Sequence, residues 1–167
     1  MNREIRFKET LKFLRKYIKK DEEILDLGVD NELANYLSCH FSNIKNTKGE
    51  NLDFNYKKYL NSKVTVAFEI FEHMLAPYNI LKELKGELVC SVPLKVWFAS
   101  AYWNKKEKWG MHYHEFEIKQ FNYLLESTGW KIIDVKIMRK PDKLRMGIRP
   151  LLRFIWNSYY FVYAIKN

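Results

Sequence analysis

Cysteine is scarce in this sequence, and long apolar runs are missing. Only Cys39 and Cys90 occur, in no metal-binding spacing, so we expect two free thiols in a reducing cytoplasm. No apolar run approaches the length of a membrane span, and residues 1–20 are too charged for a secretory signal. Repeats, low-complexity runs and linkers are also missing. The 167 residues are therefore predicted to form one globular domain, 1–167.

Positive charge is in excess, with 29 Lys and Arg against 20 Asp and Glu and a formal net charge of +9. One basic cluster spans residues 136–153, and the other lies near the N-terminus, at Lys8, Lys12, Arg15, Lys16, Lys19 and Lys20. Such clusters are typical of contact with nucleic acid, through counterion release, or with an anionic membrane surface. A solvated helix face explains the same pattern, and charge by itself does not separate the three.

Hydrophobic periodicity predicts strands that alternate with helices. Apolar residues at helical spacing over 5–18 predict a helix before the first strand. The predicted strands are 23–27, 42–47, 63–68, 87–92, 130–138 and 159–165, and the later helices are 31–40, 77–84 and 115–127. Asp30 or Asn31 is the expected N-cap of the helix 31–40, and Gly129 the glycine that ends the helix 115–127. The alternation predicts an α/β, doubly wound sheet.

Three motifs accompany these elements. ILDLG (24–28) ends the first strand, FEIFEHMLAP (68–77) follows the strand 63–68, and HYHEFEIKQFNYLLESTGW (112–130) contains the last helix. With these motifs, residues 22–140 resemble class I S-adenosylmethionine-dependent methyltransferases, of the type 11 and type 23 kind. The resemblance implies a Rossmann-like, mostly parallel sheet with a final antiparallel strand. The first edge is expected to be reduced, because the interval between Gly28 and Val64 is too short for the family's helix–strand–helix–strand succession.

The resemblance also implies S-adenosylmethionine as cofactor, with S-adenosylhomocysteine as product, at the carboxyl ends of the strands. In the family the first strand ends in acid-x-Gly-x-Gly, whose glycines let the backbone approach the cofactor. This chain keeps Asp26 and Gly28 but continues with Val29-Asp30-Asn31-Glu32. Either Asp30 or Asn31 adopts the left-handed conformation that glycine supplies, or the loop no longer cradles the cofactor.

A second family feature is an acid after the second strand that accepts hydrogen bonds from both ribose hydroxyls. Glu50 and Asp53 in KGENLDFN (48–55) are the candidates, with Glu50 preferred and an ordinary polar turn as the alternative. Glu69, at the end of the strand 63–68, is expected to shape the rim of the cofactor site.

Glu69, Glu72 and His73 form an E-x-x-E-H sequence. Ubiquinone-biosynthesis O-methyltransferases and small-RNA 2′-O-methyltransferases use a similar sequence with a distant His to hold a divalent metal. That resemblance implies a site of Glu69, Glu72, His73 and His114 for Mg²⁺, Mn²⁺ or Zn²⁺. The alternative is a segment without metal, in which His73 or His114 acts as general base. His112 is expected to be a loop residue.

Two further segments bear on the acceptor. The aromatic loop 93–113 either covers an apolar or planar acceptor or adds to the core. Residues 145–156, basic and amphipathic, suit a membrane surface or a lipid-linked acceptor, or else form a helix packed on the sheet.

Together these features predict a cytoplasmic methyltransferase, with peripheral membrane contact through 145–156 as an option. It would act on a hydroxyl or similar nucleophile of a small molecule, glycan or lipid precursor. The second hypothesis is a methyltransferase-like domain without catalysis that serves as a binding or regulatory partner. RNA methylation is the third, and it predicts a basic surface that faces the cofactor site.

Overall fold

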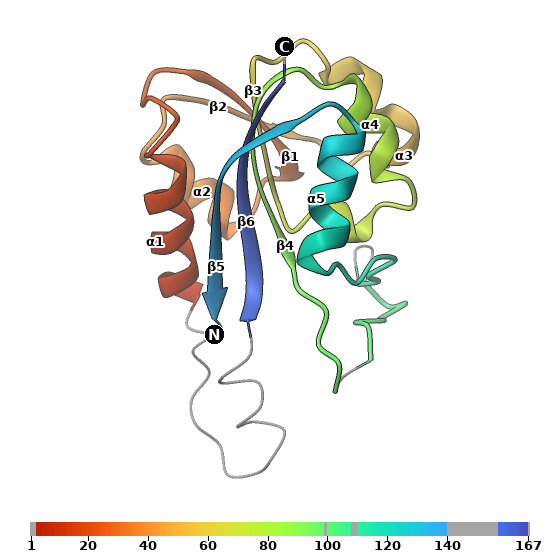
Figure 1. Ribbon diagram of the computed structural model, residues 1–167. Coiled ribbons are helices and arrows are strands. Elements are labelled where there is room, and N and C mark those ends of the chain that lie inside the picture. The colour runs from red at the N-terminus through yellow and green to blue at the C-terminus, as the bar shows by residue number, and fades with distance from the viewer. Residues whose placement is uncertain (1–2, 99, 108–109, 140–156, 167) are drawn as a thin grey trace.

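A six-stranded sheet lies between two layers of helices in the computed structural model, which describes residues 3–98, 100–107, 110–139 and 157–166 (Figure 1). The strands are β1 Glu23–Val29, β2 Asn43–Thr47, β3 Val64–Phe68, β4 Gly86–Pro93, β5 Lys131–Arg139 and β6 Asn157–Lys166. The helices are α1 Arg3–Leu14, α2 Glu32–Ser38, α3 Leu52–Asn55, α4 Pro77–Glu83 and α5 Ile118–Ser127, with 3₁₀ turns at Tyr56–Tyr59 and Phe71–His73.

The strand order is β2-β1-β3-β4-β6-β5. Strands β2, β1, β3 and β4 run parallel, and β6 is antiparallel to both of its neighbours, β4 and β5. The predicted α/β sheet with a final antiparallel strand is therefore confirmed. Between β1 and β3 the chain forms one strand, β2, and only short helices, which is the reduced first edge.

Alternating side chains of the parallel strands pack on opposite faces of the sheet. On one face, Ile24, Val64, Val66 and Val89 pack with α1 and α2. On the other face, Leu25, Ala67, Leu88 and Cys90 pack with α4 and α5. Both faces are thereby buried, and strands buried on both faces read as continuous apolar runs, as the sequence VTVAF of β3 does.

Helix ends follow the expected capping chemistry. The side chain of Asn31 accepts hydrogen bonds from the N–H groups of Leu33 (2.9 Å) and Ala34 (3.1 Å), so Asn31 is the N-cap of α2. Gly129 follows α5 with a φ of 92°, a conformation that favours glycine.

The cysteines and the apolar segments bear on the expected compartment and on membrane contact. Cys39, which is exposed, and Cys90, which is buried, are both free. No helix in the described ranges is long and apolar enough to cross a membrane. Residues 145–156, for which a membrane surface, a lipid-linked acceptor and a packed helix are the alternatives, and Trp109 of the aromatic loop lie outside the described residues.

Candidate functional site

A cavity of about 640 Å³ opens at the carboxyl ends of β1 and β3, and we call it the main cavity. Its wall contains residues of α1, of the β1–α2 turn, of the turn after β2 and of the segment after β3. In an open α/β sheet this edge is where ligands bind. Its volume lies within the range of small-molecule sites.

Gly28 lines the main cavity, whereas Asp26 lies behind it. Asp26 is only 5 % exposed, and its Oδ1 accepts a hydrogen bond of 2.8 Å from the N–H of Gly28. Burial raises the pKa of Asp26 to about 6, although the bonds from Gly28 and Asn46 act in the opposite direction. A Cβ on Gly28 would lie 3.1 Å from this same oxygen. Asp26 therefore shapes the turn, and Gly28 provides the surface.

Neither Asp30 nor Asn31 is left-handed, so the first interpretation of the glycine-poor loop is wrong. Asn31 has a φ of −151° because its side chain caps α2. The left-handed residue in this part of the cavity wall is Gly49, with a φ of 79°, in the turn after β2.

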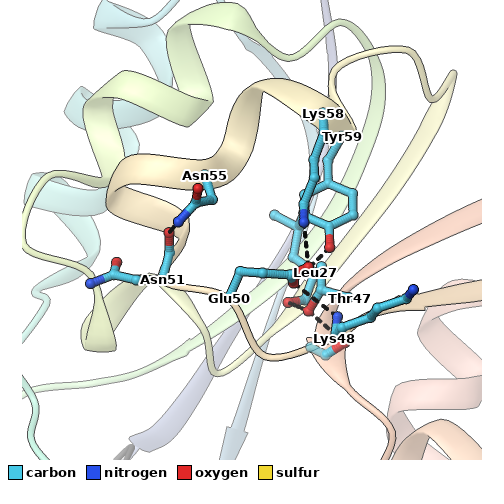
Figure 2. A network of polar contacts seen from close by, with 9 residues as sticks. Leu27, Thr47, Lys48, Glu50, Asn51, Asn55, Lys58 and Tyr59 are labelled. Atoms are coloured by element: carbon cyan, nitrogen blue, oxygen red, sulfur yellow. Dashed lines mark hydrogen bonds and ion pairs between the residues drawn. The ribbon is translucent and has the colours of Figure 1, made fainter.

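Glu50 lies in the turn after β2, and three donors bind its carboxylate (Figure 2). Its Oε2 accepts hydrogen bonds from the hydroxyl of Tyr59 (2.7 Å) and the N–H of Lys48 (2.9 Å), and its Oε1 pairs with the ammonium of Lys58. Lys58 first and Tyr59 second lower the pKa of Glu50 to about 2. The carboxylate is therefore ionised at any working pH.

Asp53, the other ribose candidate, also lines the main cavity, but the main chain binds both of its oxygens. Oδ1 accepts from the N–H of Ala76 (2.8 Å) and Oδ2 from the N–H of Leu75 (2.9 Å). These bonds join α3 to the segment before α4. Asp53 thus holds two segments of the main chain together. Two of the partners of Glu50 are side chains, which can move to make room for a ligand.

Glu69, the residue after β3, has a left-handed backbone conformation with a φ of 57°. Among the described residues other than glycine, it alone has a positive φ. Such a conformation is costly for a residue with a Cβ and tends to persist at functional sites. Its N–H donates to the carbonyl of Ser91 (2.9 Å), and its carboxylate forms an ion pair with Arg6 of α1. Both charged groups line the main cavity.

Glu72 is buried, and neither of its carboxylate oxygens has a hydrogen-bond partner among the described residues. Burial, followed by the nearby charges of Glu69 and Glu115, raises the pKa of Glu72 well above its ordinary value. One ligand atom each of Glu72, His73 and His112 lie within 4.8 Å of one another, and we call this group the Glu72 cluster.

The two histidines of the Glu72 cluster are oriented by their Nδ1 atoms. Nδ1 of His73 lies 3.0 Å from the carbonyl oxygen of Met111, so Nδ1 donates and, in the neutral imidazole, Nε2 carries the lone pair. That Nε2 lies 3.8 Å from a Glu72 oxygen. Nδ1 of His112 lies 3.5 Å from Glu115, and burial followed by the charge of His73 lowers the pKa of His112.

The structure does not bring the four predicted metal ligands into one group. Glu69 pairs with Arg6, and His114 stacks on Phe116 with Nε2 3.3 Å from the carbonyl oxygen of Leu75. His112, expected to be only a loop residue, takes the place predicted for His114. His114 lines neither the main cavity nor the smaller one described next.

A second cavity of about 410 Å³, the side cavity, adjoins the main one. Gly49, Asn51, Asp53 and His73 line both. Leu75, Met111 and Tyr113 complete the side cavity, so the C-terminal end of the aromatic loop contributes to it. His73 therefore stands where two ligands in adjoining cavities would meet.

The N-terminal basic cluster does not face the main cavity. Arg15, Lys16, Lys19 and Lys20 line a shallow cleft with His40 and Phe41. Lys20 lies just before β1 begins at Glu23, so this cleft is at the amino end of the strand, whereas the main cavity is at the carboxyl end. This arrangement differs from the surface that the RNA hypothesis predicts.

Comparison with known proteins rests on structure. No protein-family model matches the chain, and no curated protein sequence matches it. A chain of the complex between the Haloferax volcanii Trm112 methyltransferase activator and a protein assigned as a methyltransferase superposes with a TM-score of 0.71. The identity is 11%, over 95% of this chain and 86% of that one.

Two other similar structures differ in activity. The 1,6-didemethyltoxoflavin-N1-methyltransferase of Burkholderia thailandensis, with bound 1,6-didemethyltoxoflavin and S-adenosylhomocysteine, gives a TM-score of 0.60 at 14% identity, over 96% of this chain and 78% of that one. The [4+2]-cyclase SpnF gives a TM-score of 0.59 at 12% identity, over 96% of this chain and 80% of that one. With its strand order and its cavity at the carboxyl edge, this chain has the fold of class I S-adenosylmethionine-dependent methyltransferases.

Proposed function

We propose that this protein is an S-adenosylmethionine-dependent methyltransferase that acts on a hydroxyl or similar nucleophile of a small molecule, glycan or lipid precursor. The observation that carries the proposal is the main cavity, which lies at the carboxyl ends of β1 and β3 with Gly28 in its wall. A glycine there lets a ligand approach the backbone of β1, as this fold requires.

Glu50 is the proposed ligand of the ribose hydroxyls. It follows β2 and is ionised. Its three present bonds leave about one of the four acceptor sites of a carboxylate, and the second ribose hydroxyl would replace Lys58 or Tyr59, whose side chains can move. Gly28 would approach the cofactor directly, Asp26 would hold the turn, and Glu69 would line the cofactor's far end. Asp53 remains the alternative ribose ligand.

The acceptor is proposed to occupy the side cavity, with His73 between it and the cofactor. When bound, S-adenosylmethionine supplies a methyl group activated by its sulfonium. In the neutral imidazole of His73, with Nδ1 donating to Met111, Nε2 carries the lone pair and is placed to take the proton of the acceptor hydroxyl. Most of the rate enhancement would come from holding the two ligands in line.

A divalent metal is a further proposal, and the Glu72 cluster fits it better than the predicted set. A carboxylate without a partner and two oriented imidazoles form a donor set that suits Zn²⁺ or Mn²⁺. A metal on Nε2 of His73 would exclude that atom as base, so the two roles compete. Thermal unfolding with Zn²⁺, Mn²⁺ or Mg²⁺ tests this: a stabilisation that Glu72→Gln abolishes supports the metal, and none in the unaltered protein contradicts it.

A non-catalytic methyltransferase-like domain is the competing proposal. The glycine-poor loop after β1 favours it, because only Gly28 of the expected glycines is present there, and a shared fold does not fix chemistry. RNA methylation has less support, because the described basic cluster is at the amino end of β1.

Calorimetric titration with S-adenosylmethionine and S-adenosylhomocysteine decides between the first two. We expect micromolar binding that Gly28→Trp abolishes, because a large side chain there would press on Asp26 and Ile70 and change the cavity wall to which both Gly28 and Ile70 belong. Asn35→Trp, on the exposed side of α2, is the matched control and should bind normally. Absence of binding up to millimolar ligand would sink the enzyme proposal and leave the non-catalytic domain.

A further inference from the structure

We propose that β5 is a dimerisation strand, which pairs antiparallel with β5 of a second copy of this chain about a two-fold axis at Val135. β5 is the outermost strand of the sheet, next to β6, and no strand pairs with its other edge among the described residues (Figure 1). The N–H and C=O groups of a free edge form a template to which another strand adds. The inference is independent of the proposed function, because β5 lines neither the main cavity nor the side cavity.

Three β-branched side chains are exposed along β5, and we call them the β5 row. Ile133 is 45% exposed, and Val135 and Ile137 are each 43% exposed. Val135 and Ile137 lie opposite Val162 and Tyr160 of β6, so they belong to the face of the sheet that α5 covers. Ile133 precedes Val135 by the same spacing of two, at a shift in the register with β6. An apolar row of this kind on a free edge indicates an interaction surface.

β5 lacks the features that usually protect the edge of a sheet. It is nine residues long, whereas strands typically have about five or six, and it contains neither proline nor glycine. Its two inner charges are already held by other parts of the chain. Asp134 forms an ion pair with Lys16 (3.1 Å), and Lys136 forms one with Glu9 of α1. These charges are therefore compensated and oppose the approach of a second strand less than free charges would.

The other edge of the sheet has a different character. β2 has five residues, and its exposed side chains, Asn43 and Lys45, are polar. A short polar edge is a poor template for pairing. Of the two edge strands, β5 is therefore the one suited to a partner.

A second copy fits the β5 row, because the row is symmetric about its centre. With Val135 opposite Val135 of the second copy, Ile133 lies opposite Ile137 of that copy, and the same contact occurs again by symmetry. β-branched residues directly opposite one another stabilise a strand pair. All three side chains of each row thus meet an apolar neighbour.

The charges of β5 select the same register. It places Asp134 opposite Lys136 of the second copy, twice by symmetry. A shift of the axis by one residue would place either Asp134 or Lys136 opposite itself, and like charges directly opposite are destabilising. The preferred register also places Lys131 opposite Arg139, but both are exposed at the ends of the strand, where solvent weakens the repulsion. Charge complementarity therefore favours the axis at Val135.

The strand directions keep both main cavities open in such a dimer. β6 is antiparallel to both β4 and β5, so β5 runs parallel to β4 and its carboxyl end lies at the edge of the sheet that holds the main cavity. An antiparallel partner therefore has its own main cavity at the opposite edge of the joined sheet. A contact formed by one strand from each copy is small, so we expect a dissociation constant of roughly 10 to 100 µM.

The first measurement is analytical ultracentrifugation over concentrations from well below to well above this dissociation constant. We expect a reversible monomer–dimer equilibrium, and Val135→Lys should raise the dissociation constant by at least about tenfold, because it places two ammonium groups side by side on the axis. Tyr123→Lys is the matched control, since Tyr123 is 73% exposed on α5. It should change the dissociation constant by no more than about twofold.

The second measurement is disulfide cross-linking in a Cys39→Ser background, which removes the exposed native thiol. Residues opposite one another on antiparallel strands have Cα atoms roughly 5 Å apart, a distance that a disulfide spans. Val135→Cys should therefore form a covalent dimer on oxidation. Ile137→Cys should not, because the two copies of residue 137 would be roughly 14 Å apart along the strands.

Three results would overturn the inference. They are a monomer at every concentration, a dimer that Val135→Lys leaves unchanged, and cross-linking of Ile137→Cys as efficient as that of Val135→Cys. Calorimetry of Val135→Lys with S-adenosylhomocysteine keeps the two proposals apart. Loss of the dimer with unchanged ligand affinity supports the dimer, and failure of the unaltered protein to bind the ligand contradicts only the proposed function.

Discussion

Asp26 and Glu72 are both buried carboxyl groups, but their surroundings differ. Asp26 accepts a hydrogen bond from the N–H of Gly28, whereas the oxygens of Glu72 have no partner in the described part of the chain. Burial raises the pKa of each, since desolvation penalises the charged form. A carboxylate without a partner is costly unless a ligand or proton compensates it, which makes Glu72 a functional candidate and Asp26 a structural one.

Asp26 should make the stability of the protein depend on pH. Its pKa of about 6 lies above the ordinary value of 3.8, so its contribution is fully present below pH 4 and is lost as the pH rises through 6. Relative to Asp26→Asn, the free energy of unfolding of the unaltered protein should fall by up to about 3 kcal/mol between pH 4 and pH 7. Urea unfolding at steps of pH measures this difference, and parallel profiles of the two proteins would contradict it.

Glu50→Gln should weaken S-adenosylhomocysteine binding by roughly tenfold, because an amide retains one acceptor where the ribose needs an ionised pair of oxygens. Tyr59→Phe is the control: it removes one donor to Glu50 and keeps the carboxylate, so its effect should be smaller. Calorimetry measures both. If a folded Asp53→Asn variant lost binding while Glu50→Gln kept it, Asp53 would be the ribose ligand.

Sequence reasoning could identify residues at or shortly after the carboxyl end of a strand, such as Gly28, Glu50 and Glu69, because strand ends are visible in the hydrophobic pattern. It missed Arg6 and His112. Arg6 meets Glu69 across 63 positions of sequence, and its approach depends on how α1 packs on α2. His112 and His114 are two residues apart, and only the path of the loop decides which of them meets His73.

At the scale of elements, the long periodic segments were predicted to within a few residues. The four-residue helix α3 and the 3₁₀ turn Tyr56–Tyr59 were not, because four residues are too few to display a helical period. Helix α3 contributes Leu52 and Asp53 to the wall of the main cavity, and the 3₁₀ turn supplies Lys58 and Tyr59, which hold Glu50 in that wall. The reduced edge was thus foreseeable from the length of the interval, but its conformation was not.

Asn31 is expected to stabilise α2, because it is the N-cap of this helix at the rim of the main cavity. Asn31→Ala should lower the free energy of unfolding by about 1 kcal/mol, since two backbone N–H groups lose their acceptor. Asn35→Ala, in the middle of the same helix and exposed, should leave stability equal or slightly higher. Chemical denaturation compares the three proteins, and equal stabilities for the two variants would show that the cap contributes nothing.

At the scale of the whole molecule, the sheet determines where a ligand binds but not what happens to it. An N-methyltransferase and a cyclase superpose on this chain almost equally well, with TM-scores of 0.60 and 0.59. The difference between such proteins lies in side chains around the cavities. In this chain those side chains come from α1, from the turn after β2, from the segment after β3 and from the end of the aromatic loop.

The cleft lined by Arg15, Lys16, Lys19 and Lys20 and the main cavity lie at opposite ends of β1. Lys19→Glu combined with Lys20→Glu should therefore leave the affinity for S-adenosylhomocysteine within about twofold, because the cleft at the amino end of β1 is far from the ligand. If single-stranded RNA binds this cleft, the same double variant should weaken that binding. The slope of the logarithm of the binding constant against the logarithm of the salt concentration should become shallower by about 0.7 for each phosphate that the protein no longer neutralises. Calorimetry and filter binding at several salt concentrations measure the two effects. If RNA instead competed with S-adenosylhomocysteine for binding, and the double variant abolished this competition, the RNA would reach the main cavity from the basic cleft. That outcome would support RNA as the acceptor.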